Sequence, residues 1–140
     1  MQREIIHTSA VYTSRSHLSQ AARWGDLVWT GGLGPLDVAG NIISDDIAAQ
    51  ARQCLENLHA VLRTAGSDLN HVLKVNVYLR QIEDFAAFEA VYKTFFTDTP
   101  PPRCVIACSL GHPASEGRPG MAIEIEAVAG VPAATAEETV

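Results

Sequence analysis

Two charged residues near the C-terminal end of the chain could do chemistry on a small substrate. Arg103 follows a run of prolines at residues 100–102, which restricts the backbone and delivers the arginine rigidly to the start of an apolar strand. A guanidinium suits a small carboxylate, because its planar fork donates two parallel hydrogen bonds and keeps its charge. Glu124 lies in a strictly alternating segment and could act as an acid–base group. From the residues alone, Arg103 could instead be an ion-pairing or surface arginine, and Glu124 could lie on a solvated strand face or form a structural salt bridge.

A glycine-rich turn, Thr30-Gly31-Gly32, could form the wall of a ligand site. Glycine allows a ligand to approach the backbone closely, and Thr30 and Gly31 could donate hydrogen bonds to a bound carboxylate or water. The segment lacks both the GxGxxG order of a dinucleotide fold and the lysine of a P-loop, so it does not predict a phosphate site. A plain turn at the end of a strand is an equally good interpretation.

Cys104, directly after Arg103, is a further candidate for contact with a ligand. A nucleophilic thiolate needs a positioned base, and no histidine can be assigned to that role, so Cys104 is predicted to be a wall of the pocket. The three cysteines and five histidines show no CxxC spacing, no HExxH and no histidine pair four residues apart. We therefore predict no metal, no cofactor and no disulfide framework.

Composition argues against several classes of partner. The chain of 140 residues has a net charge of −6, and its ten Lys and Arg residues are scattered singly, which disfavours general binding to nucleic acid. It contains no run of apolar residues long enough to span a membrane, and no apolar segment of secretory length at its start. The odd number of cysteines fits a reducing compartment, so we predict a cytoplasmic protein. The charge and the lack of long apolar segments predict that it binds neither nucleic acid nor membranes.

Periodicity predicts one α+β domain over residues 1–130. The expected order is strands, helix, strand, helix, strands, which favours a mixed sheet of about six strands with both helices packed on one face. The expected strands cover residues 2–7, 18–24, 27–30, 71–80, 103–108 and 122–128, and the expected helices run from Asp46 to Gly66 and from Asp84 to the prolines. Residues 131–140 are expected to form a disordered tail.

Alternation also predicts which side chains face the helices and which lie on the opposite side of the sheet, here called the open face. The residues expected on the helix side are Leu73, Val75, Val77 and Leu79 of the sheet and Phe85, Phe88, Val91, Tyr92 and Phe95 of the second helix. Those expected on the open face are Lys74, Asn76, Tyr78, Glu124 and Glu126, together with Val72 and Val128. A partly polar open face suits a homo-oligomer whose clefts lie between subunits.

Several segments, taken as a set, closely resemble the YjgF/Rid (reactive intermediate deaminase) family, which also carries the older label endoribonuclease L-PSP. They occur in the order and nearly the spacing of the family over roughly residues 15–130. The segments are Ser19-Gln20-Ala21 with Arg23, Gly25-Asp26-Leu27-Val28, Gln50-Ala51-Arg52-Gln53, Leu55-Glu56-Asn57-Leu58, Ala65-Gly66, Val75 with Val77-Tyr78-Leu79, Asp84-Phe85-Ala86, Tyr92, Phe95-Phe96, Pro102-Arg103 and Ile123-Glu124-Ile125-Glu126-Ala127. The resemblance implies a chorismate-mutase-like α+β fold, a homotrimer with three clefts between subunits and, in the best understood branch, hydrolysis of enamines and imines to keto acids and ammonia.

The resemblance also implies roles for single residues. Arg103 matches the family arginine that grips the substrate carboxylate. Glu124 matches the glutamate associated with the hydrolytic water, and Gly32 matches the glycine of the cleft wall. These matches predict a site in which Arg103 anchors the substrate and Glu124 handles water and a proton.

Three features depart from the family pattern. Leu18 stands where deaminase-active members usually have a tyrosine, Glu89 stands where they usually have an asparagine, and residues 103–110 form a segment one residue shorter than usual. Leu18 and Glu89 are both expected to contact substrate. Two functions stay open: a deaminase that needs neither metal nor cofactor, and a trimer of the same fold that binds a small metabolite without turnover. The acidic composition and the absence of a histidine pair disfavour a ribonuclease.

Overall fold

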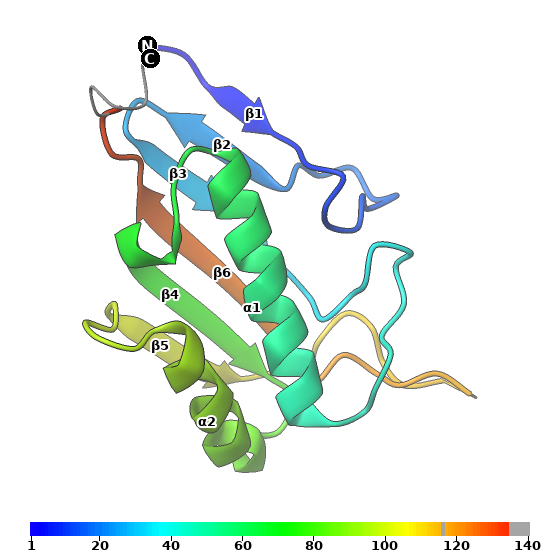
Figure 1. The fold of residues 1–140 in the computed structure, drawn as a ribbon. Coiled ribbons are helices and arrows are strands. Elements are labelled where there is room, and N and C mark those ends of the chain that lie inside the picture. The colour runs from blue at the N-terminus through cyan, green and yellow to red at the C-terminus, as the bar shows by residue number, and fades with distance from the viewer. Residues whose placement is uncertain (116, 135–140) are drawn as a thin grey trace.

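The computed structural model describes residues 1–115 and 117–134, which form a layer of sheet covered by a layer of helices (Figure 1). The predicted α+β architecture, with both helices on one face of a mixed sheet, is confirmed. The strands are β1 (Glu4–Ile6), β2 (Ala21–Trp24), β3 (Leu27–Thr30), β4 (Val72–Leu79), β5 (Arg103–Ala107) and β6 (Ile123–Gly130). The helices are α1 (Ile47–Thr64) and α2 (Phe85–Phe95), with two short 3-10 helices, η1 (Leu69–His71) and η2 (Ile82–Asp84).

The strand order in the sheet is β1-β2-β3-β6-β4-β5. Neighbouring strands are antiparallel except β4 and β5, which are parallel because the chain crosses back through α2 between them. The C-terminal strand β6 therefore lies inside the sheet, between β3 and β4, whereas β5 is an edge strand. This order separates Arg103 on β5 from Glu124 on β6, because β4 lies between these two strands.

Helix α1 is fixed at both ends and along one face. The Asp46 carboxylate caps its first turn by accepting a hydrogen bond from the Ala49 N–H at 3.0 Å. Gly66, with φ of 84°, follows the last turn in a conformation that a side chain would strain. The side chains that recur at helical spacing are buried against the sheet, as predicted: Ala51, Cys54, Leu55, Leu58, Val61 and Leu62.

The predicted faces of β4 are wrong at its first residues. The register with β6 shifts between Val72 and Lys74, so two residues of β4 oppose one residue of its partner. As a result Val72, predicted on the open face, is buried, and Leu73, predicted on the helix side, is 52% exposed. From Lys74 onward the predicted alternation is confirmed.

The buried face of α2 is also narrower than predicted. Phe88, Val91 and Tyr92 are buried, as expected, but Phe85 is 37% exposed. Phe85 begins the helix, and its ring packs edge-on against Phe88 with the centroids 6.2 Å apart. The Arg103 guanidinium lies 5.6 Å from the centroid of the same ring. Phe96, just after the helix, is buried in addition.

The N-terminal hairpin is confirmed, with a shorter first strand. β2 and β3 pair around a turn in which Gly25 has φ of 61°. β2 begins at Ala21 rather than at the predicted Leu18, so Leu18 belongs to the loop that precedes the sheet. This displacement turns Leu18 from a strand residue into a loop residue beside the end of the sheet.

The C-terminal end of β6 joins the core. Val131, the first residue after the strand, is buried and donates its N–H to the Asp26 carbonyl at 2.7 Å. Of the tail predicted to be disordered, residues 135–140 lie outside the described residues.

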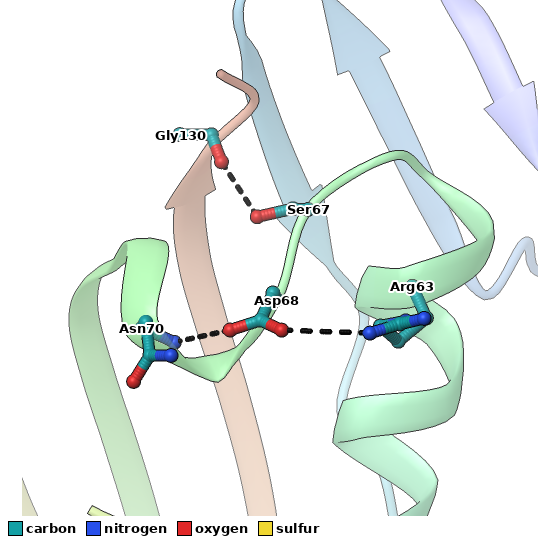
Figure 2. Close-up of polar contacts among 5 residues, drawn as sticks. All are labelled: Arg63, Ser67, Asp68, Asn70 and Gly130. Carbon is teal, nitrogen blue, oxygen red and sulfur yellow. Dashed lines mark hydrogen bonds and ion pairs between the residues drawn. The ribbon is translucent and has the colours of Figure 1, made fainter. Parts of the chain in front are cut away.

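The turn after α1 is tied to the end of β6 (Figure 2). Ser67 is buried, and its hydroxyl donates to the Gly130 carbonyl at 2.5 Å. Asp68 caps η1 by accepting from the Asn70 N–H at 2.8 Å, and its other oxygen lies 3.7 Å from Nη1 of Arg63. Since the Arg63 side chain is 67% exposed, this ion pair contributes less than the buried hydrogen bond of Ser67.

Ser67→Ala is expected to lower the free energy of unfolding by about 1–2 kcal/mol, because it leaves a carbonyl in the interior without its donor. Arg63→Ala is the control from the same turn, with an expected loss below about 1 kcal/mol. Urea unfolding at one fixed protein concentration measures both. A larger loss in Arg63→Ala than in Ser67→Ala would contradict this account of the turn.

Candidate functional site

Glu124 lies on the open face of the sheet, against the glycine-rich turn. Its neighbours in β6, Ile123 and Ile125, are fully buried under the helices, so the alternation of the strand directs Glu124 to the other side. Two backbone hydrogen bonds between Leu33 and Ile125, at 2.8 and 3.0 Å, hold the turn beside β6. A Cβ built on Gly32 would overlap the Glu124 carboxylate, so the carboxylate keeps this position only beside a glycine.

A second carboxylate, Glu126, organises the polar part of the open face. It accepts hydrogen bonds from the Tyr78 hydroxyl at 2.7 Å and from the Asn76 amide at 3.1 Å. The hydrogen bond to Glu126, with smaller contributions from burial and from the charges of Glu126 and Glu124, raises the pKa of Tyr78 to about 12. Glu126 is therefore engaged within the fold, whereas Glu124 has no hydrogen-bond partner among the described residues.

The surroundings of Glu124 favour its protonated form. Burial raises the pKa of the Glu124 carboxyl above its ordinary value, the nearby charge of Glu126 raises it further, and His112 acts in the opposite direction. A carboxyl group with a raised pKa gains and loses its proton closer to neutral pH than an exposed glutamate does, which suits general acid–base chemistry.

Glu124, Gly32 and Leu18 line one cavity of about 360 Å³, which lies between the N-terminal loop and the sheet. Three of the predicted site residues are thus brought together. Gly32 lines this cavity, and its N–H has no acceptor within the described part of the chain. The site thus holds a carboxylate with a raised pKa and a glycine whose N–H is available to a ligand that can reach it.

Arg103 lies on the other side of the sheet, beneath α2. It pairs in register with Val75, a residue that is fully buried on the helix side. Its Nη1 lies 2.6 Å from Oε2 of Glu89, and its guanidinium lies over the Tyr92 ring at 4.6 Å from the centroid. Only 21% of the Arg103 side chain and 26% of the Glu89 side chain are exposed. Within one chain, Arg103 therefore forms an ion pair, which was one of the alternatives that the sequence left open.

The structure does not bring Arg103 and Glu124 together in one chain. Glu89, predicted to contact substrate together with Leu18, lies instead with Arg103 at a separate cavity beside α2. Cys104 lies on the open face, where its sulfur is 3.6 Å from Nζ of Lys74 and apart from the cavity of Glu124. The predicted site residues therefore fall into a group on the open face and a group on the helix side.

Thr30 and Gly31 use their hydrogen-bonding groups within the fold. The Thr30 hydroxyl donates to the Gly31 carbonyl at 2.9 Å and accepts from the Ala127 N–H at 3.0 Å. The Gly31 N–H donates to the Gln20 carbonyl at 2.8 Å. Both residues position the turn, and the donor that remains for a ligand is the N–H of Gly32.

Sequence reasoning missed several walls of the cavity around Glu124. Arg15, His112 and Met121 line it together with Glu124. They lie in segments without strand or helix periodicity, and only the folded chain brings these segments to the same end of the sheet. The sequence therefore carries no local signal that would have assigned them to the site.

None of the helices in the described residues is both long and apolar enough to cross a membrane. In the same part of the chain, no cluster of three or more His, Cys, Asp or Glu side chains is placed to hold a metal ion.

The family model described as Endoribonuclease L-PSP matches residues 8–131. A RutC family protein from Haemophilus influenzae is 36% identical over 134 residues, covering 92% of this chain and 98% of the relative. A 2-iminobutanoate/2-iminopropanoate deaminase from Salmonella typhimurium is 37% identical over 79 residues, covering 56% of this chain and 62% of that enzyme. The crystal structure of the YjgF gene product from Escherichia coli superposes with a TM-score of 0.82 at 30% identity, covering 92% of this chain and 99% of that structure.

Fold and site thus define a small α+β protein with a partly buried carboxylate in a cavity at one end of its sheet. The chain belongs to the YjgF/Rid family, and its fold is the chorismate-mutase-like fold of that family. The family includes imine deaminases, although many relatives carry only a family name.

The raised pKa of Glu124 has a consequence for stability. The folded protein binds the Glu124 proton more tightly than the unfolded chain does, so folding loses stability as the pH rises from the ordinary glutamate pKa, about 4.3, through the raised value. Glu124→Gln removes the ionised form and is expected to raise the midpoint of urea unfolding at pH 7, with no gain below about pH 4.

Glu83→Gln is the matched control, because Glu83 is an exposed carboxylate outside the cavity. Its midpoint is expected to stay within error of the wild type. An equal gain in both variants, or a gain in Glu124→Gln that persists at low pH, would rule out burial of the Glu124 charge as the cause.

Proposed function

We propose that this chain is a RidA-like hydrolase that deaminates reactive enamine and imine intermediates to 2-keto acids and ammonia. The observation that carries the proposal is the placement of Glu124, with a raised pKa and no internal partner, in a cavity beside the free N–H of Gly32. Membership of a family that includes a 2-iminobutanoate/2-iminopropanoate deaminase supports the reaction class.

The proposed chemistry needs one water and one proton carrier. Ionised Glu124 takes a proton from water as the oxygen bonds to the imine carbon, and gives this proton to the nitrogen, which yields a carbinolamine. Glu124 then takes the proton of the carbinolamine hydroxyl as the carbonyl forms and the carbon–nitrogen bond breaks, and passes it to the leaving nitrogen. The products are a 2-keto acid and ammonia, and Glu124 returns to its starting state. The N–H of Gly32 is placed to hold the substrate or the attacking water in the same cavity.

In this proposal Arg103 holds the substrate carboxylate across a subunit boundary of a homotrimer. Arg103 and Glu124 lie on opposite sides of one sheet, so a site that uses both must take them from two copies of the chain. β5 is an edge strand, which a neighbouring copy can approach. The bond to Glu89 uses Nη1, and a guanidinium has five N–H donors, so further donors remain for a carboxylate.

A second candidate is a trimer of the same fold that binds a small metabolite without turnover. One observation favours it: Glu89, at the place where deaminase-active members usually have asparagine, already holds the arginine that the reaction would need. In that reading the cavity beside Glu124 binds a keto acid and releases it unchanged.

The deciding measurement is the release of pyruvate from freshly generated 2-iminopropionate, compared with the spontaneous rate. The wild type is expected to accelerate hydrolysis, and Glu124→Gln to lose a factor of about 10² to 10⁴ as expected for an acid–base group. Arg103→Ala is expected to be inactive. Light scattering, run beside the kinetics, is expected to show a trimer.

Two outcomes separate the candidates. If neither 2-iminopropionate nor larger imines are hydrolysed faster than in buffer, the deaminase proposal fails and the binding function replaces it. If hydrolysis is fast but Arg103→Ala keeps full activity, the deaminase proposal stands and the carboxylate anchor lies elsewhere.

A further inference from the structure

We infer that the cavity beside Glu124 binds the side chain of the substrate, and that the preferred substrates are imines of amino acids with bulky apolar side chains. The inference rests on the proposed function and names its substrate class. The exposed surface of the cavity is more apolar than polar, although the lining also includes hydroxyl groups of the N-terminal loop, those of Thr13, Ser14 and Ser16 among them.

One part of the cavity wall is apolar and held in place by the core. Its lining includes side chains that belong to the core or to the buried end of the sheet, and that are therefore held in place by packing. These are Ile6, Val11, Leu33 and Met121, each at most 9% exposed, with Leu18 and Leu36 completing the wall. A ligand that enters removes apolar surface on both partners from water, which favours an apolar group.

The buried polar side chains in the wall already have partners in the protein. Gln20 accepts from the Thr8 N–H at 2.7 Å and donates to the Thr8 carbonyl at 3.0 Å. The Asn57 amide donates to the carbonyls of Gly34 and Leu36 at 3.0 and 2.9 Å. A polar substrate side chain that reaches these two buried amides would have to displace their bonds within the protein, which costs affinity.

The size and the charge of the cavity also favour bulky ligands without a second carboxylate. A volume of about 360 Å³ lies within the range of about 300–1,000 Å³ typical of sites for small organic ligands, and it exceeds what a three-carbon imino acid fills. The Glu124 carboxylate repels a second carboxylate on the substrate. Arg15, a cation in the lining, lies in an exposed loop and is screened by solvent, so it compensates little of this repulsion, and His112 offsets part of the charge of Glu124.

Leu18 makes more room in the cavity for a bulky apolar side chain. It stands at the cavity where deaminase-active members of the family usually have a tyrosine, and leucine removes a hydroxyl and a ring from the wall. Because Leu18 is 63% exposed, its side chain can be enlarged without disturbing the core. This makes it the position from which the cavity can be filled by mutation.

Binding of the stable 2-keto acid products tests the inference without requiring turnover. Calorimetry should compare pyruvate, 4-methyl-2-oxopentanoate, phenylpyruvate and 2-oxoglutarate on the wild-type protein. The two apolar ligands are expected to bind about tenfold or more tightly than pyruvate, and 2-oxoglutarate more weakly than either, since each apolar group that enters such a pocket gains about this factor.

Leu18→Trp is expected to fill the cavity and to remove the preference for the larger apolar ligands over pyruvate. Ile82→Trp is the matched control, because Ile82 is 50% exposed on η2 and does not line the cavity. It is expected to keep the preference. Thermal melting tests whether both variants are folded. The comparison of keto-acid affinities on the wild-type protein does not depend on either variant.

Equal affinities across the series, tighter binding of 2-oxoglutarate, no binding of any keto acid, or a Leu18→Trp protein that keeps the wild-type preference would each overturn the inference. The deaminase proposal is tested separately. Hydrolysis of 2-iminopropionate without a size preference in binding leaves that proposal standing and removes only the side-chain pocket.

Discussion

The hydrogen-bond register between neighbouring strands is the constraint on which the rest of the structure depends, because it decides which side of the sheet each side chain occupies. The helix side is filled by apolar residues such as Val75 and Ile123, both fully buried. A charge on that side needs a partner in place, since an unpaired charge removed from water is strongly unfavourable. Arg103 meets this requirement through Glu89 and the aromatic ring of Tyr92.

The long elements could be predicted because their periodic signal is repeated several times. Helix α1 shows its apolar stripe over five turns and begins at a capping residue, Asp46. β6 alternates over its whole length, so the place of Glu124 on the open face followed from its neighbours in sequence. That Gly32 and Glu124 share a site was implied by the family resemblance, and their close contact is visible only in the folded chain.

The parts that escaped prediction depend on pairing between distant segments. β5 is a short edge strand with an apolar run after Arg103, so its sequence does not show on which face of the sheet Arg103 lies. The register of Arg103 with Val75 places it on the helix side. The bulge that exposes Leu73 likewise exists only against β6. The consequence for function is that Glu124 has its cavity on one side of the sheet and Arg103 its partner on the other.

A double-mutant cycle between Arg103 and Glu89 tests this assignment of faces most directly. The free energy of unfolding is measured by urea titration for the wild type, Arg103→Gln, Glu89→Gln and the double variant, at one protein concentration. A pair that is 2.6 Å apart and mostly buried predicts a coupling energy of about 1–2 kcal/mol. Additive losses, with a coupling below about 0.3 kcal/mol, would show that Arg103 does not lie against α2 and would contradict the account.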